Sequence, residues 1–446
     1  MNMRSIPTWV QALAFFLVVA VVVYVTFSQG LLTEYWQQVI LTGAIMTISA
    51  LGLNLKYGYT GLFALGQAAF YGIGAYSSAL VTKDWLTQWS GSPVGGLAGL
   101  LGIEAGFVAS VVVLSLLKVG KRRRALREWL ERLISPFEAT VLTTVVTVLV
   151  GAAVLGVVGG GVGWLVRRAA LLVVPAVLGG LPMAVSQQII FLVALIAGAV
   201  LAALIGFLIS LPLLNLTYDY LCIATLGFGI ITYVFFNNAD VLIPTMKGAR
   251  GMVAIPRLTT WPWVVGALAV ALVVMRNLIY SSTGRAILAT RDDLIAADTM
   301  GIDTYQHKIL AYTIGCAYAG LAGGLYAHLY AFLHPSNFTW LKSVDPFVMV
   351  VFGGVGSMTG TILGAFSFVT LLEGLRVLPA EMIDWRYVIY PVILLLVMLF
   401  RPQGIMGTGE WGFLKRPKVG EKDVAEEPVS ARHVAAPGTQ SSLSDE

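Results

Sequence analysis

The amino-acid sequence predicts an all-α, polytopic membrane helix bundle. Hydrophobic residues make up 58% of the 446 residues, whereas charged residues make up only 11%, and the mean hydropathy is +0.84. Average soluble domains carry roughly 25% charged residues, so this chain has too few charges to cover a water-facing surface. Uncharged stretches of about 20 residues, the length that crosses a bilayer, recur along the chain. We therefore expect about ten spans and one glycine-rich re-entrant hairpin.

The candidate spans are the apolar stretches that lie between charged or polar segments. They are residues 9–29, 38–55, 57–82, 94–117, 139–166, 188–211, 220–239, 258–275, 309–330 and 387–400, with the hairpin at residues 346–372. Residues 169–182 are too short to span and end in Gly-Gly-Leu-Pro, so we expect an interfacial or re-entrant segment there. Residues 1–400 then form the transmembrane domain. Residues 401–446 form a tail that we expect to be disordered from about residue 420, where apolar residues are scarce.

Basic segments set the expected orientation, because cytoplasmic loops carry an excess of Lys and Arg. The basic segments are residues 118–132, residues 284–308 and the segment from residue 401. Counting crossings then places both termini in the cytoplasm, provided that residues 169–182 do not cross and that residues 346–372 enter and return. Arg167 and Arg168 are the exception, because they fall on the outer side in this scheme.

A glycine-rich segment at residues 53–76 carries polar side chains within an apolar stretch. Glycines in a spanning helix permit close packing or a break, and a break frees backbone groups that can line a substrate path. We assign Thr60, Gly61 and Gln67 to such a translocation path, and a polar amide such as that of Gln67 requires a partner at membrane depth. Packing of small residues is the alternative interpretation of each glycine.

A second glycine-rich segment, at residues 347–366, repeats the pattern of a helix, a break and a helix in the other half of the chain. Paired glycine-interrupted segments in two halves of a chain point to a transporter binding site. The candidate path residues at its centre are Gly353, Gly354, Gly356 and Ser357.

A third segment, at residues 284–308, is polar and charged and lies between two expected spans. We expect Thr290 to cap a short helix, with Asp292 and Asp293 in its first turn, where carboxylates suit the helix dipole. Small residues leave one side of this helix open for another protein to dock. These small residues are Ala296, Ala297 and Gly301. An ordinary solvated loop is the alternative interpretation.

Six strings in succession give the chain a specific resemblance. They are GLNLKYGYTGLFALGQAAFYGIGAY at 52–76, YLCIATLGFGIITYVFFNN at 220–238, GRAILATRDDLIAADTMGID at 284–303, YAGLAGGLYAH at 318–328, FVMVVFGGVGSMTGTILGA at 347–365 and LFRPQGIMG at 399–407. Their collinear order resembles the LivM type of permease from the branched-chain amino acid ABC transporters.

The resemblance implies a function and a set of partners. Such permeases work beside a LivH-like second permease, with two cytoplasmic ABC ATPases and a periplasmic substrate-binding protein, in the bacterial plasma (inner) membrane. The chain would form a translocation path for branched-chain or other neutral amino acids. It would not be an enzyme, because ATP and Mg²⁺ would be used by the partner ATPases. The outer loop at residues 247–251 resembles the family's glycine-rich outer loop and would face the binding protein.

The resemblance also implies an ATPase-coupling loop at residues 285–302. The residues that match the family's pattern there are Arg285, Arg291, Asp292, Asp293, Ala296, Ala297 and Gly301. Residues 84–187 depart from the family, because they are much longer than its usual link. They hold extra spans and the basic segment at 118–132, for which anionic membrane lipid is a candidate partner.

Other functions find little support in the residues. The sequence lacks a G-x-x-x-x-G-K-[ST] string for nucleotide phosphates and a metal-ligand spacing, so we expect no cofactor in this chain. The net charge of +5 lies in loops between apolar runs and does not indicate nucleic acid binding. Urea or short amides are the alternative cargo. An intramembrane enzyme or a sensor is a more distant alternative, because the expected spans contain almost no ionisable residues.

Overall fold

The computed structural model is helical in every regular element that it describes. It describes residues 23–26, 33–87, 95–116, 153–178, 182–214, 216 and 218–375, with residues 143, 146, 392, 395, 396, 399–401, 403–407, 409–411 and 414. An isolated β-bridge joins Met252 to Leu333. The predicted all-α class is confirmed for these residues. Most of the expected spans at 9–29 and 387–400, the basic segment at 118–132 and the tail from residue 420 lie outside them.

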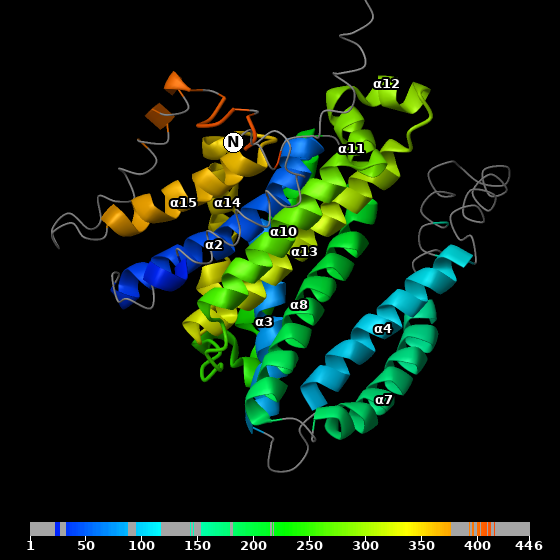
Figure 1. Cartoon of the computed structure of the whole chain (residues 1–446). Helices are drawn as coiled ribbons and strands as arrows, with labels where there is room; N and C mark the ends of the chain where they lie inside the picture. Colours follow the sequence, from blue (N-terminus) through cyan, green and yellow to red (C-terminus); the bar gives the residue numbers. More distant parts are fainter. Residues whose placement is uncertain are drawn as a thin grey trace, which may run out of the picture.

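Five helical segments in the described part of the chain are long and apolar enough to cross a membrane (Figure 1). They belong to α2 (Glu34–Asn54) with its π-helical extension η2 (Leu55–Tyr59), α8 (Met183–Leu213), α9 (Tyr218–Asn237), α10 (Trp261–Tyr280) and α13 (Thr304–Tyr330). The other α-helices are α3 (Gln67–Thr87), α4 (Gly95–Leu116), α7 (Gly160–Leu178), α11 (Ser282–Asp292), α12 (Leu294–Thr299), α14 (Val344–Gly353) and α15 (Met358–Gly374). Short turns are the π-helical η3 (Leu155–Gly159) and the 3-10 helices η4 (Ala239–Val241), η5 (Pro244–Met246), η6 (Gly248–Arg250), η7 (Pro335–Phe338) and η8 (Trp340–Ser343).

Helix α13 lies at the centre of the bundle and packs most extensively against α3 and α8, and next against α2 (Figure 1). Glycines on α13 allow the backbones to approach closely. A Cβ atom on Gly315 would lie 2.5 Å from the carbonyl oxygen of Gly52 in α2, and one on Gly320 would lie 2.6 Å from Cβ of Ala202 in α8. Such small-residue contacts hold membrane helices together by close van der Waals packing.

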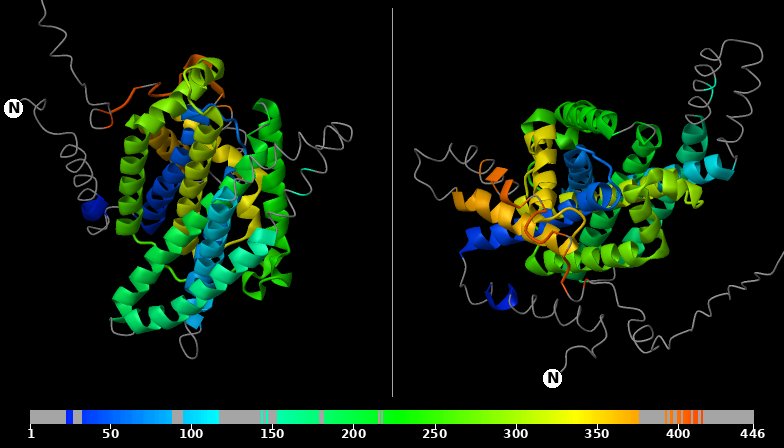
Figure 2. Two further views of the ribbon diagram at one scale, coloured as in Figure 1. Left: turned by 90° about the vertical axis from the view of Figure 1, so that its right-hand side faces the viewer. Right: turned by 90° about the horizontal axis from the view of Figure 1, so that it is seen from above.

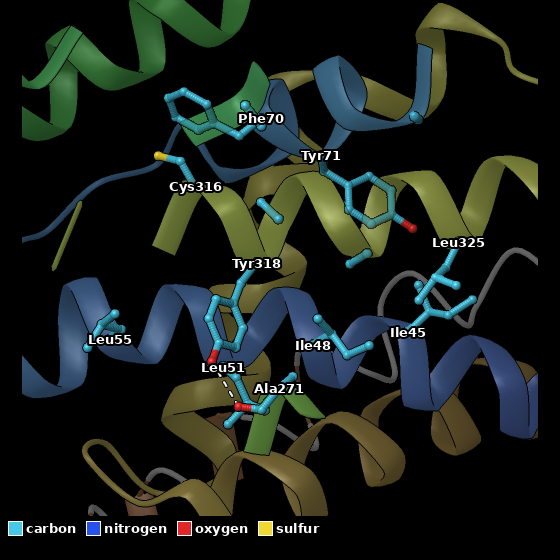
Figure 3. Close-up of a cluster of buried hydrophobic side chains, with 14 of the residues drawn as sticks. Ile45, Ile48, Leu51, Leu55, Phe70, Tyr71, Ala271, Cys316, Tyr318 and Leu325 are labelled. Atoms are coloured by element: carbon cyan, nitrogen blue, oxygen red, sulfur yellow. Dashed lines mark hydrogen bonds between the residues drawn. The ribbon is translucent and has the colours of Figure 1, made fainter. Parts of the chain in front are cut away.

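Bulky side chains fill the core around these contacts. Ile45, Ile48 and Leu51 of α2 are buried in the main hydrophobic cluster (Figure 3). In the same view, the hydroxyl of Tyr318 in α13 donates a 2.8 Å hydrogen bond to the backbone carbonyl of Ala271 in α10. Helices α2, α10 and α13 are therefore joined in one core.

Helices α4 and α7 form a tight pair at the edge of the bundle (Figures 1 and 2). Gly102 and Gly106 of α4 face Gly159 and Gly163, so each side of the contact has the G-x-x-x-G spacing. A Cβ atom on Gly102 would lie 2.7 Å from the carbonyl oxygen of Gly163. This spacing lets two membrane helices approach at their backbones. The pair belongs to the stretch at residues 84–187 that departs from the family pattern.

The structure corrects the expected interruption of the helix after residue 166. Helix α7 continues through Arg167 and Arg168 to Leu178, so residues 169–178 are not a separate interfacial segment. Hydropathy falls at the two arginines, but arginine is a good helix former and the helix continues. The guanidinium of Arg168 lies over the ring of Trp164, 4.4 Å from its centroid.

The structure also corrects the expected connector at Lys56, between the apolar stretches 38–55 and 57–82. Helix η2 continues α2 past this residue, and Lys56 is only 1% exposed. The backbone leaves the helix at Gly61, whose φ is +75°, and α3 begins six residues further on. The hydropathy pattern places the end of the first span at the charged Lys56. The backbone leaves the helix later, at Gly61, because glycine tolerates a left-handed conformation.

Candidate functional site

The two predicted glycine-rich segments meet at one end of the bundle, here called the coupling end. It comprises residues 54–66, residues 353–359 and the helices α11 and α12 (Figure 1). In the first segment, η2 ends at Tyr59, and the hydroxyl of its C-cap Thr60 donates a 2.8 Å hydrogen bond to the carbonyl of Leu55. The expected helix break therefore exists, and it lies before α3.

Asn54 joins the first segment to the second. Its side-chain Nδ2 donates to the carbonyl of Ser357 at 3.0 Å and to the hydroxyl of Thr361 at 2.9 Å. Its Oδ1 accepts a 3.0 Å hydrogen bond from the backbone N–H of Gly356. The side chain is fully buried. The sequence interpretation did not single out Asn54, although an amide in an apolar stretch carries the same signal that identified Gln67.

The second segment is confirmed as a helix, a break and a helix, while its re-entrant path through the membrane stays a prediction. Helix α14 ends at Gly353, and Gly354 and Gly356 have φ values of +128° and +80°. Ser357 then caps α15, because its hydroxyl accepts a 2.9 Å hydrogen bond from the N–H of Gly360. Two residues in left-handed backbone conformations explain why glycine occupies these positions.

Residues 403–407 and 409–411 dock on this second break. The N–H groups of Ile405 and Met406 donate to the carbonyls of Phe352 and Gly353, at 2.9 and 3.1 Å. The carboxylate of Glu410 accepts hydrogen bonds from the N–H groups at the start of α15 and from a threonine hydroxyl there. Its donors are Met358 N at 2.6 Å, Thr359 N at 3.1 Å and Thr359 Oγ1 at 2.6 Å. A carboxylate at a helix N-terminus satisfies free N–H groups and suits the helix dipole.

The predicted coupling loop forms two short helices with defined caps. The N-cap of α12 is Asp293, whose Oδ1 accepts from the N–H groups of Ile295 at 2.8 Å and Ala296 at 3.1 Å. The expected cap at Thr290 is wrong. Thr290 lies inside α11, where its hydroxyl donates back to the carbonyl of Ile287. Threonine and aspartate both favour N-cap positions. Because α11 extends through Asp292, the N-cap of the next helix falls on Asp293 and not on Thr290.

Most predicted coupling residues lie on the surface. The exposed members are Arg285, Arg291, Asp292, Asp293, Ala296 and Gly301. Ala297 is buried and faces the protein's own interior. The most exposed apolar side chains of the loop are Ile295, at 79%, and Met300, at 82%, which the sequence interpretation did not single out. These two exposed apolar side chains lie on the six-residue helix α12 and at its C-cap.

Arg291 connects the coupling loop to both glycine-rich breaks. A Cβ atom on Gly61 would lie 3.6 Å from Cγ of Arg291, and one on Gly356 would lie 3.0 Å from its Nη1. A pocket of about 450 Å³ opens beside this contact. Its lining includes Thr60, Gly61, Thr290, Arg291, Asp293 and Lys308. Arg291, which was predicted for coupling, therefore lines the same pocket as Thr60 and Gly61, which were predicted for the translocation path.

Gln67 lies apart from this pocket, in the interior of the bundle. Its Nε2 donates a 2.9 Å hydrogen bond to the carbonyl of Ser49 in α2, and its Oε1 has no hydrogen-bond partner among the described residues. Within the same part of the chain, no three metal-ligating side chains gather.

At the opposite end of the bundle, the outer loop contains a second polar pocket, of about 480 Å³. Its lining residues are Asp240, Pro244, Lys247, Arg250, Gly251 and Val253. Lys247 and Arg250 are both exposed.

Apolar spans, two broken glycine-rich segments and an exposed two-helix loop between spans place the chain in the class of polytopic helical membrane proteins. The profile described as branched-chain amino acid transport system / permease component matches residues 141–398, more than half of the chain, and the chain belongs to this family.

Curated relatives agree with this family. The high-affinity branched-chain amino acid transport system permease protein LivM of Escherichia coli is 32% identical over 246 residues, 47% of this chain and 56% of the relative. The LivH permease protein of the same system in Salmonella typhimurium is 28% identical over 198 residues, 40% of this chain and 61% of the relative. BraD of Pseudomonas aeruginosa is 33% identical over 132 residues, 29% and 41% of the two chains. The chain thus spans about half the length of the LivM relative. No solved structure matches the chain.

Proposed function

We propose that this chain is one permease subunit of an ABC importer for branched-chain amino acids. The relatives are named as permeases of such systems, and they include both LivM and LivH types, so a LivH-like second permease is the expected membrane partner. The observation that carries the proposal is the position of Arg291, which lies between an exposed two-helix loop and both glycine-rich breaks.

The coupling loop is the proposed contact for one of two cytoplasmic ATPases, which bind the ATP and Mg²⁺. Ile295 and Met300 would enter a groove on the ATPase, since exposed apolar side chains on a short helix form a natural anchor. Nucleotide-driven movement of the ATPase would shift α11 and α12 as a rigid body. Because Arg291 lies against Gly61 and Gly356, that shift would reach both breaks.

The outer pocket is the proposed docking place for a periplasmic substrate-binding protein. Exposed Lys247 and Arg250 offer positive charge there, which would steer a partner with an acidic face. This arrangement requires a bacterial inner-membrane location with the coupling end, and both termini, in the cytoplasm. Basic residues at the coupling end, such as Arg285 and Arg291, agree with that orientation.

The proposal is tested by purification of the chain from its native membrane in mild detergent, with mass spectrometry of the proteins that accompany it. We expect a second permease and an ATPase with the wild-type chain. Replacement of Met300→Glu should release the ATPase, because a carboxylate would be buried in the apolar contact. Val241→Glu is the matched control, since Val241 is also 82% exposed but lies in the outer loop.

Retention of the ATPase by the Met300→Glu protein would contradict the proposed docking face. Binding assays on the accompanying binding protein identify the cargo. Preference for urea or short amides over branched-chain amino acids would overturn the proposed cargo while leaving the importer architecture in place.

A further inference from the structure

Lys56 is enclosed in the middle of the helix bundle. Its Nζ lies 5.1 Å from the ring centroid of Phe70 in α3 and 4.8 Å from that of Tyr312 in α13. It is also 3.5 Å from Sγ of Cys316, which lies near Phe70 in Figure 3. The aliphatic part of the Lys56 side chain packs against Gly315, where an added Cβ atom would lie 2.7 Å from Cε of Lys56.

No carboxylate forms an ion pair with Lys56 within the described residues, where the salt bridge found joins Lys342 to Asp345. A buried ammonium without a counter-ion is strongly unfavourable, and intramembrane charges of this kind mark functional sites. The two aromatic faces offset part of the cost, but a thiol is a weak hydrogen-bond acceptor. A negatively charged group would complete the surroundings of Lys56.

Three buried polar atoms on α2, α3 and α13 lack hydrogen-bond partners among the described residues, and one of them belongs to Tyr312, whose ring contacts Lys56. Among the described residues, no hydrogen bond is made by Oη of Tyr312, Oε1 of Gln67 or Oγ of Ser49, although all three are buried. The amide of Gln67 lies beside the same glycine contact against which Lys56 packs. A Cβ atom on Gly52 would lie 3.4 Å from Nε2 of Gln67 and 2.5 Å from the carbonyl oxygen of Gly315.

The unpartnered groups match the two charges of an amino acid. A carboxylate requires donors, and Lys56 Nζ and the hydroxyl of Tyr312 are donors. An ammonium requires acceptors, and Gln67 Oε1 and Ser49 Oγ are acceptors. The ring of Phe70 beside them offers an apolar wall for an aliphatic side chain.

We infer that the contact between Gly52 and Gly315 is a closed binding site that opens to hold a zwitterionic α-amino acid. In the open site, Lys56 and Tyr312 bind the carboxylate, and Gln67 binds the ammonium. The backbones of α2 and α13 approach closely at these two glycines, and the proposed opening separates the helices at this contact. The inference rests on the proposed importer function and names its cargo class as amino acids with a free carboxylate.

The coupling end is placed to control this opening. Asn54, two residues before Lys56, is bonded to the second glycine-rich break, and Gly61, five residues after Lys56, touches Arg291. A shift of α11 and α12 would therefore move the helical turn that carries Lys56. Cargo binding and the position of the ATPase would be linked through η2.

The test uses the complete transporter in proteoliposomes, with ATP inside and the loaded binding protein outside. Cargo uptake and ATP hydrolysis are measured together. Lys56→Met should reduce uptake per ATP by about tenfold or more, because a hydrogen bond to a charged group contributes at least this factor. Hydrolysis stimulated by the binding protein should fall by less than uptake, because the Asn54 and Arg291 contacts of the coupling end are retained. Lys342→Met is the matched control for the same loss of charge at an exposed site and should leave both rates unchanged.

Tyr312→Phe separates transport from folding. Its hydroxyl makes no hydrogen bond in this structure, so its removal does not weaken the closed state. Uptake per ATP should still fall by about two- to tenfold, because a donor to the carboxylate is lost. Tyr76→Phe is the matched control, since the Tyr76 hydroxyl is also buried and unpartnered but lies elsewhere in the bundle.

Wild-type uptake per ATP in both Lys56→Met and Tyr312→Phe would overturn the inference. Loss of assembly in Lys56→Met together with wild-type uptake in Tyr312→Phe would also overturn it, because Lys56 would then be structural. Absence of stimulated ATP hydrolysis in the wild-type transporter would instead refute the proposed function on which the inference depends.

Discussion

Glycine has different roles in the α4–α7 pair and at the coupling end. In the pair, Gly102 and Gly106 lie within a continuous helix and allow another helix to approach its backbone. At the coupling end, Gly61 and Gly356 have positive φ and interrupt the helices. The difference shows that a glycine-rich sequence does not by itself distinguish packing from a break. Polar partners make the distinction, because the break is bonded through Asn54 whereas the pair is joined by backbone contacts.

The largest effect is expected for Asn54→Leu. The substitution removes the three hydrogen bonds that join Asn54 to the second glycine-rich segment and leaves the half-buried N–H of Gly356 without its partner. We expect a loss of about 3 kcal/mol in the free energy of unfolding, measured by denaturant titration of the purified protein. Asn237→Leu is the control, since that amide bonds only to its own helix at 3.3 Å. Equal stability of the two variants would mean that the coupling end does not depend on this junction.

The second-largest effect compares a glycine at the α4–α7 contact with a glycine that faces open space. Gly106→Ala places a methyl group against the carbonyl oxygen of Gly159, whereas Gly160→Ala meets open space. We expect the first to destabilise the pair by about 1–3 kcal/mol. The second should be neutral or stabilising, by up to about 1 kcal/mol, because alanine favours the helix. Limited proteolysis would detect loosening of the pair. Equal stability of the pair in the Gly106→Ala and Gly160→Ala variants would contradict this prediction.

A third, smaller effect concerns the carboxylate at the second break. Glu410→Gln keeps one acceptor oxygen but removes the negative charge at the N-terminus of α15, so we expect about 1 kcal/mol less stability. Glu410→Ala removes all the bonds and should be worse. Denaturant titration of both variants gives the comparison, and an order reversed from this one would exclude the capping role.

The smallest effect distinguishes capping from docking at α12. Asp293→Ala should lose about 1 kcal/mol through the missing N-cap, while Asp293→Asn should lose a few tenths, because asparagine caps as well as aspartate. Equal retention of the ATPase by the wild type and the Asp293→Asn variant in copurification would identify Asp293 as a cap. A selective loss in the asparagine variant would identify its charge as part of the contact.

The sequence predicted the helical class, both glycine-rich breaks and a polar helical segment between two spans at residues 284–308, because these depend on local composition and spacing. It did not predict Asn54 or Glu410 as site residues. Their partners lie about 300 and 50 positions away in the sequence, and folding alone brings them together. Lys56 was missed for a different reason: a charge in an apolar stretch resembles a loop until the helix is seen to continue past it.

The α4–α7 pair explains how part of the residues 84–187 is accommodated, at an edge away from the coupling end (Figure 2). A role for this stretch at anionic lipid, and disorder of the tail from residue 420, stay predictions. The pair can vary in length without disturbing the central helix, because its contacts are made mainly with α3 and α8.

The most direct test of the account is ATP hydrolysis by the complete transporter with Arg291→Met. Arg291 lies against Gly61 and Gly356, so its loss should break the connection between the loop and both breaks while Ile295 and Met300 still hold the ATPase. We predict that the ATPase copurifies as in wild type but that its hydrolysis no longer responds to the loaded binding protein. Wild-type stimulation in this variant would show that coupling does not pass through Arg291 and would contradict the account.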